Sequence, residues 1–274
     1  MSDYVSLNFN QRRVFDAAME WWKGDRSEPF EISGPPGTGK TYLIDTIIDY
    51  LGLDRSNVAP LAYTGAAAIN MRFHGMINAK TIHSWLYKPV MEYIYDENGN
   101  IVMDPVFNKP KTKIVYIEKD PSELSTILLF VADEAGTIPP SMRVTMEKYN
   151  IPIIAAGDID QLPPIHGKPA FLNDPSKIHF LTEIMRQSLN SGIVQISQML
   201  REGYQPHCGM YSDAIVIRKH QLTYDMLVKS KIILCGRNAT RDEFNDLMRG
   251  FHGYKGELPT SRSEERRVGK ECRS

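Results

Sequence analysis

The chain is poor in cysteine and carries no surplus of either charge. Its 274 residues include only three cysteines, and 32 Lys and Arg residues against 33 Asp and Glu residues give a formal net charge of −1. Three cysteines cannot form a disulfide framework for a chain of this length, and their spacing fits no zinc pattern. The charge balance excludes a protein coated with basic side chains for nucleic-acid binding, although a local basic groove is compatible with it.

Long apolar segments are also lacking. No apolar run approaches the roughly 18 residues that a membrane-spanning helix needs, and the N-terminus has no secretory signal. We therefore expect a cytoplasmic protein without a membrane partner. The content of 42% hydrophobic and 24% charged residues is that of a globular protein, and the chain length suits one or two domains.

What the chain does have is an alternation of short apolar runs with amphipathic segments. We predict an N-terminal helix that is capped by Asn10 and buries Val14, Ala18 and one or both of Trp21 and Trp22. Strands that alternate with helices indicate an α/β fold with a doubly wound parallel sheet. The predicted strands are 29–32, 58–62, 127–132 and 151–156, and the further predicted helices are 40–51, 65–71 and 141–149.

Two regions depart from this alternation. Residues 88–121 are polar and β-like, and Asn98-Gly99 is a strong turn signal, so we predict a small β-hairpin insertion there. After Glu183 a second alternation begins, which predicts about half of a second α/β lobe. Its helices are predicted at 192–201, 224–229 and 241–249, and its strands at 214–217 and 231–235.

The segment between the first strand and the following helix is a phosphate-binding loop. It reads Gly34, Pro35, Pro36, Gly37, Thr38, Gly39, Lys40 and Thr41, which matches G-x-x-x-x-G-K-[ST] in the required strand-to-helix context. The backbone N–H groups of such a loop and the helix N-terminus bind phosphate oxygens. We therefore expect ATP here, with Lys40 on the β- and γ-phosphates and the Thr41 hydroxyl as a ligand of Mg²⁺.

Two later motifs supply groups for hydrolysis. Asp133 and Glu134 follow the apolar run 127–132, and the carboxyl end of a buried parallel strand is where phosphates bind. We predict that Asp133 holds Mg²⁺ and that Glu134 orients and deprotonates the attacking water. Gln161 lies in GDIDQLPP, after the next buried strand. It is predicted to bond the γ-phosphate and to release after hydrolysis, as a two-state sensor.

In this order, the motifs of roughly residues 5–250 resemble those of superfamily 1 DNA helicases of the RecD/Dda-like branch. The resemblance implies a RecA-like P-loop NTPase lobe at 1–183 and a partial second RecA-like lobe at 184–261. It implies 5′→3′ translocation on single-stranded DNA, driven by ATP hydrolysis, and duplex unwinding. It further implies single-stranded or forked DNA and proteins of replication, recombination or repair as partners, in a bacterial cell or a phage-infected host.

The resemblance also assigns two nucleotide contacts. Residues 7–11 (LNFNQ) are similar to the adenine-reading motif of the family, with Gln11 as the reader. Residues 181–187 (LTEIMRQ) are similar to the motif whose arginine reaches the γ-phosphate from the second lobe, which makes Arg186 the implied arginine finger.

DNA contacts are implied in the same way. Residues 63–67 (YTGAA) and 81–84 (TIHS) are similar to two DNA-contact motifs, from which Thr64, Thr81 and His83 follow as DNA-binding residues. The hairpin at about 90–118 falls where relatives carry the pin that splits the duplex.

The end of the chain has no structural pattern. Residues 262–274 read RSEERRVGKECRS, and their first eleven letters resemble a translated sequencing adaptor, so we expect a non-native tail there. Two further motifs of the helicase family, a Gln-Gly pair and a last arginine, have no match after Gly250. We therefore expect the second lobe to be incomplete and its coupling of hydrolysis to movement to be poor.

Two other interpretations are compatible with these motifs. One is an RNA helicase or RNA-stimulated ATPase of the same superfamily. The other is a nucleic-acid-binding module without motor activity, whose ATP site only switches affinity. The intact Lys40, Glu134 and Gln161 argue against this last interpretation for the parent protein.

Overall fold

The computed structural model describes residues 3–105, 107–164, 167–183 and 191–253, and it separates into two compact units. The first unit comprises Met1–Arg186 and the second comprises Gln187–Ser274. The expected boundary at 183/184 borders residues outside this description, and the expected tail at 262–274 lies wholly outside it. The two units are described separately below.

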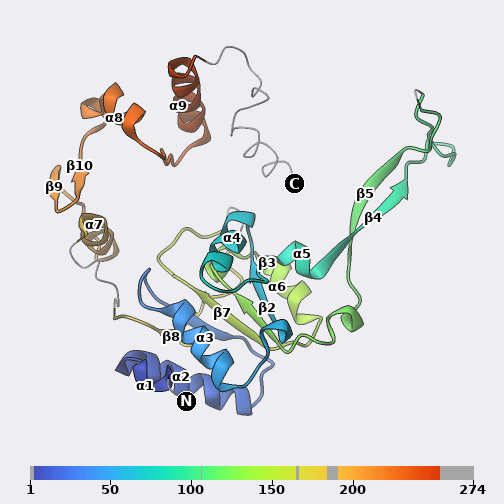
Figure 1. The fold of residues 1–274 in the computed structure, drawn as a ribbon, viewed down its shortest axis with the longest axis horizontal. Helices are drawn as coiled ribbons and strands as arrows, with labels where there is room; N and C mark the ends of the chain where they lie inside the picture. Colours follow the sequence, from blue (N-terminus) through green and yellow to red (C-terminus); the bar gives the residue numbers. More distant parts are fainter. Residues whose placement is uncertain (1–2, 106, 165–166, 184–190, 254–274) are drawn as a thin grey trace. The chain divides into compact units, whose positions relative to one another are not determined.

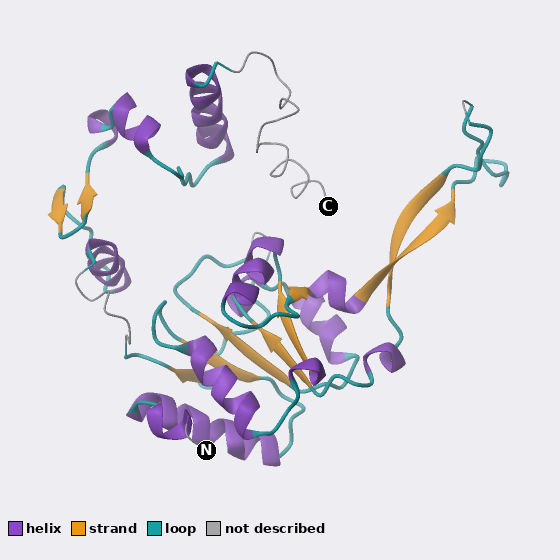
Figure 2. Ribbon diagram, in the orientation of Figure 1, coloured by secondary structure: helices purple, strands orange, loops and turns teal. Residues whose placement is uncertain are grey.

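A six-stranded parallel sheet forms the centre of the first unit (Figures 1 and 2). Its spatial order is β3-β2-β6-β7-β1-β8, and all neighbouring strands run parallel. This confirms the predicted α/β, RecA-like fold. The strands are β1 (Phe30–Ser33), β2 (Val58–Ala62), β3 (Lys80–Thr81), β6 (Leu129–Ala132), β7 (Ile153–Gly157) and β8 (Ile178–Phe180).

Helices cover both faces of this sheet. Along β6, Leu129 and Val131 belong to one core cluster, while Phe130 and Ala132 belong to the other. All four are completely buried, which explains why this strand reads as an uninterrupted apolar run. The first cluster packs under α2 (Phe9–Lys23), α3 (Lys40–Tyr50) and α4 (Gly65–Phe73), and the second packs under α5 (Ile82–Leu86) and α6 (Pro140–Glu147).

Short helical segments complete the first unit. They are α1 (Asp3–Ser6), η1 (Arg55–Asn57), η2 (Pro121–Leu124) and η3 (Ala135–Thr137). None of the helices in the described ranges combines the length and the apolar character that crossing a bilayer requires.

The N-terminal helix α2 begins earlier than the sequence predicts. Its N-cap is Asn8, whose Oδ1 accepts a hydrogen bond from the Gln11 amide at 2.7 Å, while Gln11 Oε1 accepts one from the Asn8 amide at 3.1 Å. The prediction of Asn10 as cap was therefore wrong, because the reciprocal capping box fixes the cap two residues earlier, at Asn8. Asn10 Oδ1 instead accepts a hydrogen bond from the Thr182 amide at 3.2 Å.

The predicted β insertion is a long two-stranded arm that projects from the sheet (Figures 1 and 2). Strands β4 (Tyr87–Tyr93) and β5 (Thr112–Glu118) pair antiparallel over their whole length. Beyond them the chain forms two small loops instead of one turn. Three backbone bonds close this junction: Ile94 donates to Lys111, Lys111 to Val102, and Val102 to Ile94, at 2.8–2.9 Å. Gly99, with φ of +82°, turns the first of these loops, as Asn98-Gly99 predicted.

The described part of the second unit contains helices and an antiparallel hairpin. Its elements are α7 (Gly192–Arg201), β9 (Gly209–Tyr211), β10 (Ala214–Val216), η5 (Lys219–Gln221), α8 (Tyr224–Lys229) and α9 (Asn238–Phe251). The strand predicted at 231–235 was wrong. Ile232 and Leu234 there are 77% and 91% exposed. An apolar run becomes a strand only beside a partner strand, and the described residues place none there.

Gly192 lies close to the backbone of the β9–β10 hairpin. A Cβ on Gly192 would lie 1.5 Å from the Tyr211 carbonyl oxygen, and the Gly192 amide donates to Asp213 Oδ1 at 2.6 Å.

We expect Gly192→Ala to separate α7 from the β9–β10 hairpin and to speed amide exchange across 192–216, measured by hydrogen–deuterium exchange mass spectrometry. Gly236→Ala is the control, because no heavy atom lies within 4 Å of its added Cβ. Equal exchange in both variants would contradict this packing.

Candidate nucleotide-binding site

Three sequence motifs meet at one edge of the parallel sheet. The loop 34–39 follows β1, Asp133 and Glu134 follow β6, and residues 158–161 follow β7. Strands β6, β7 and β1 are neighbours in the sheet, so their carboxyl ends lie side by side. Segments that are far apart in sequence are thereby brought into one site, as expected for ligand sites of open parallel sheets.

Glycine shapes the loop after β1. The Gly34 amide donates to the Gly157 carbonyl at 3.1 Å, and a Cβ on Gly34 would lie 2.5 Å from the Leu181 carbonyl oxygen. Gly37 and Gly39 have φ of +87° and +79°, which disfavour other residue types. The buried Thr38 closes the loop, because its Oγ1 donates to the Pro35 carbonyl at 2.9 Å.

Lys40 and Thr41 begin helix α3 directly after this loop. Lys40 Nζ donates to the carbonyl oxygens of Gly34 at 2.6 Å and Pro35 at 3.1 Å, which holds the ammonium over the loop. A flexible glycine loop, an ammonium group and a helix N-terminus together favour a polyphosphate. Thr41 and Asp133 are an all-oxygen donor pair, the kind that Mg²⁺ prefers. The residues present therefore fit both ATP and Mg²⁺.

The acidic pair lies half-buried at the end of β6. The Asp133 amide still donates to the Leu61 carbonyl at 3.0 Å, and Asp133 Oδ1 accepts from the Glu134 amide at 3.0 Å. Glu134 has φ of +50°, an uncommon value outside glycine and one that is frequent at functional sites. The strand thus ends at Ala132, Asp133 still bonds to β2, and the chain turns sharply at Glu134.

Burial dominates the electrostatics of this pair. Burial raises the pKa of Asp133, against the opposing effects of the Glu134 amide, Lys40 and His74. Burial and the neighbouring Asp133 raise the pKa of Glu134, which Lys40 lowers. Two carboxyl groups held at raised pKa values beside one ammonium are typical of sites for cations and proton transfer.

The segment after β7 contains a residue that the sequence analysis missed. Asp158 is buried, its Oδ1 accepts from the Asp160 amide at 3.1 Å, and its charge raises the pKa of Glu134. Ser33, the last residue of β1, connects the segment after β7 to the phosphate loop, because its Oγ accepts a hydrogen bond from the Ile159 amide at 3.1 Å. An acid directly after a fully apolar strand was the available signal. Gln161 is exposed on the same segment.

Gln11 has a structural contact in addition to its predicted role. Its side chain is only 1% exposed, and its Nε2 donates to the Thr38 carbonyl at 3.1 Å. Since Gln11 Oε1 also closes the α2 capping box, one amide side chain connects the start of α2 to the phosphate loop. Its contact with adenine stays a prediction.

The residues predicted to bind DNA follow the next two strands of the same edge. Thr64 follows β2 and caps α4, with its Oγ1 accepting from the Ala67 amide at 3.2 Å. Thr81 ends β3 and caps α5, with its Oγ1 accepting from the Ser84 amide at 3.2 Å. His83 is exposed and stacks on Tyr87 at 5.5 Å between ring centres. Arg186, the implied arginine finger, lies outside the described residues.

Comparison with known families agrees with this geometry. A family model described as "AAA domain" matches residues 6–221. The chain belongs to this AAA-domain family. One relative is a Pif1 helicase, which agrees with the resemblance of the sequence motifs to superfamily 1 helicases.

Two curated relatives of this AAA domain cover part of the chain. It is 28% identical over 177 residues to the ATP-dependent DNA helicase Pif1 of Psychrobacter sp. (strain PRwf-1), a match that covers 59% of this chain and 25% of the relative. It is 30% identical over 146 residues to an uncharacterized protein of Methanocaldococcus jannaschii, covering 51% of this chain and 12% of that protein. The chain thus matches at most a quarter of the length of these relatives.

A solved structure supports the fold of the AAA domain. Bacteroides Pif1 bound to single-stranded DNA superposes with a TM-score of 0.50 at 18% identity, covering 87% of this chain and 55% of that one. At this identity the likeness concerns the fold alone.

The buried Asp133 makes a prediction about the unliganded AAA domain. Because its folded pKa is raised, the group favours folding below the ordinary pKa of aspartate, and this contribution is lost as pH rises through the folded pKa. Asp133→Asn should therefore raise the melting temperature at about pH 8 and much less at about pH 4. Added Mg²⁺ and ATP should stabilise the variant less than the parent, as scanning fluorimetry can measure.

Asp25→Asn is the control for this effect. Asp25 is exposed, and hydrogen bonds from Ser27 lower the pKa of its carboxyl group, the opposite direction from Asp133. Its substitution should not raise the melting temperature at either pH. An equal rise in both variants would show that loss of an acid, and not burial, is responsible.

Proposed function

We propose that this chain carries the ATP-hydrolysing part of a DNA helicase that moves 5′→3′ along single-stranded DNA and unwinds forked duplex. The observation that carries the proposal is the placement of five motifs along one edge of the parallel sheet. Three of them, after β1, β6 and β7, suit a nucleotide, and two, after β2 and β3, suit a nucleic acid. The Psychrobacter relative, an ATP-dependent DNA helicase, and Bacteroides Pif1 bound to single-stranded DNA support this assignment.

The nucleotide side of the edge would hydrolyse ATP. Lys40 binds the β- and γ-phosphates, and the backbone of 34–39 surrounds the phosphate chain. Thr41 and Asp133 would hold Mg²⁺, which would neutralise negative charge on the phosphates. Glu134, whose pKa is raised, takes the proton of the attacking water, and Gln161 senses the γ-phosphate. Arg186 serves as arginine finger and Gln11 reads adenine.

The nucleic-acid side would hold single-stranded DNA. Thr64, Thr81 and His83 supply hydroxyl and imidazole groups at the ends of β2 and β3 and on α5. Such contacts to phosphates bind DNA without regard to sequence and weaken as salt rises. The host would be a bacterial or phage-infected cell, where forked DNA and replication or recombination proteins are the partners.

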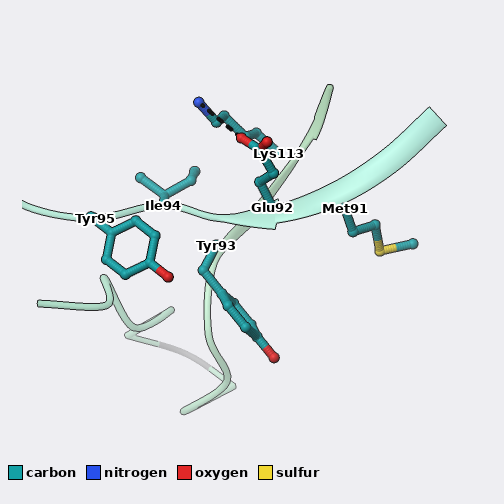
Figure 3. Close-up of a pocket in the computed structure, with 6 residues that line it drawn as sticks. All are labelled: Met91, Glu92, Tyr93, Ile94, Tyr95 and Lys113. Atoms are coloured by element: carbon teal, nitrogen blue, oxygen red, sulfur yellow. Dashed lines mark ion pairs between the residues drawn. The ribbon is translucent and has the colours of Figure 1, made fainter. Parts of the chain in front are cut away.

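The β4–β5 arm suits the role of a pin that separates the strands of forked DNA. Figure 3 shows Tyr93 and Met91 on one face of the arm and the ion pair of Glu92 with Lys113 on the other. The first face also carries Ile114 and Tyr116 from β5, and all four apolar side chains are exposed. A groove of about 570 Å³ lies along Met91–Tyr95 and Lys113. Exposed aromatic and apolar side chains on a projecting ribbon can stack on bases.

The ATPase assignment is tested by Lys40→Ala. We expect this substitution to lower ATP hydrolysis stimulated by single-stranded DNA by about 100-fold or more, because the charge on the transferred phosphoryl group loses its ammonium partner. Lys177→Ala is the control, since Lys177 precedes β8 at the opposite edge of the sheet and pairs with Glu28 at 3.4 Å. Unchanged turnover in Lys40→Ala would overturn the site assignment.

The same ATPase measurement with RNA in place of single-stranded DNA tests the choice of nucleic acid. Stronger stimulation by RNA than by DNA would favour an RNA helicase.

The pin assignment is tested by deleting the arm. Replacing residues 92–116 by a short glycine linker should abolish unwinding of a forked duplex and leave DNA-stimulated ATP hydrolysis within about twofold, because the nucleotide edge is untouched. Strand separation followed with a fluorescent fork measures the first quantity. Full unwinding by the shortened chain would eliminate the pin.

A further inference from the structure

Helix α5 connects the end of β3, on the side of the sheet edge that we propose to hold DNA, to the β4–β5 arm. It spans only Ile82–Leu86, with Thr81 of β3 as its N-cap and Tyr87 of β4 directly after it. A helix this short is not stable by itself, because the carbonyl groups of its last turn have no partners within the helix. Whatever binds those carbonyls therefore sets the angle at which the arm leaves the sheet.

One residue binds three of these carbonyls in succession. Lys119 Nζ donates to the Ser84 carbonyl at 3.1 Å and to the Trp85 carbonyl at 2.8 Å, while the Lys119 amide donates to the Leu86 carbonyl at 2.8 Å. Lys119 directly follows β5, the returning strand of the arm. A cation at a helix C-terminus is also favoured by the helix dipole. The end of the returning strand is thus bonded to the helix from which the arm begins.

The core holds this junction in place. Tyr149, 9% exposed in the second core cluster, donates its hydroxyl to the Leu86 carbonyl at 3.2 Å and to the Lys119 carbonyl at 2.9 Å. Trp85 Nε1 donates to the Pro60 carbonyl in β2 at 3.0 Å. Lys119, Tyr149 and Trp85 therefore connect arm, helix and sheet through hydrogen bonds that all end on backbone carbonyl oxygens.

Other contacts at the base of the arm are weaker. Lys88 pairs with Glu123 and Lys148 pairs with Glu118, both at 2.7 Å, and these side chains are 35–52% exposed. Exposed ion pairs of this kind add little, because water and salt screen them. The contacts of Lys119 and of the Tyr149 hydroxyl, by contrast, reach the backbone of α5 itself.

We propose that Lys119 is a positioning residue that fixes the direction of the β4–β5 arm relative to α5. The arm and residues 81–83 then move as one rigid body, so DNA held at the end of β3 would meet the arm at a constant angle. The rigid connection follows from the contacts above, and only its consequence for unwinding rests on the proposed function.

The rigid connection is tested with spin labels on the full chain. Cys208, Cys235 and Cys272 are replaced by Ser, and single cysteines are introduced by Met91→Cys in the middle of β4 and Glu20→Cys on the exposed side of α2. Double electron–electron resonance then measures the distance between arm and core. We expect a narrow distribution in this parent and a broadened or shifted one after Lys119→Met, which keeps the aliphatic stem and removes the ammonium.

Lys88→Met is the matched control, because it removes an exposed ion pair at the same base of the arm. Its distance distribution should superpose on that of the parent. Superposition of the Lys119→Met distribution as well, or equal broadening in both variants, would overturn the proposal. If Lys119→Met does not fold, the same measurement is made on Tyr149→Phe, which removes only the hydroxyl that joins Leu86 to Lys119. We expect this variant to broaden the distance distribution. An unchanged distribution in Tyr149→Phe would overturn the proposal.

The consequence for unwinding has a separate readout. Lys119→Met should slow unwinding of a forked duplex by about tenfold and leave DNA-stimulated ATP hydrolysis within about twofold, because only the placement of the arm is lost. A parent chain without either activity would overturn the proposed function and leave the spin-label result to decide the role of Lys119. Equal loss of both activities in the variant would assign Lys119 to general stability instead.

Discussion

The pairing of β6 with β7 and of β7 with β1 is the constraint on which the site depends. Parallel strands end at the same edge, so this order places the phosphate loop, the acidic pair and the segment after β7 next to one another. The pairing is itself a consequence of burial on both faces, since these strands present apolar side chains to two separate core clusters. A shift of one strand would bury the wrong set of side chains and separate Asp133 from Lys40.

This arrangement holds charged groups at a cost in stability. Asp133 and Glu134 lie where burial raises their pKa values, and Lys40 provides only partial compensation. The surrounding structure keeps them there through backbone contacts: the Asp133 amide stays in the sheet, and Gly34 and Ser33 connect the loop to β7. A site for Mg²⁺ and polyphosphate needs such uncompensated charge before its ligand arrives, because the ligand supplies the opposite charges.

The β4–β5 arm is likewise held in place by backbone contacts. An isolated two-stranded ribbon is only marginally stable, and the exposed apolar face of β4 and β5 does not stabilise it. Its direction is set at its base, where the last turn of α5 and the residue after β5 share hydrogen bonds. The phosphate loop, the segments that we propose to contact DNA and the arm are therefore linked through β2, β3 and α5 within the first unit.

The sequence by itself determined most of the helices and strands and the motifs of the candidate nucleotide site. The apolar runs at 127–132 and 151–156, the glycines of the P-loop and the Asn98-Gly99 turn act through local backbone preference and burial, which a short segment carries within itself. Tertiary structure decided the features that depend on partners distant in sequence. These are the strand order, the two-residue β3 and the burial of Asp158, together with the hydrogen bonds of Gln11 to Thr38 and of Lys119 to α5. The apolar run at 231–235 also shows that a strand depends on distant partners. A strand forms only beside another strand, and the described chain places none next to this segment.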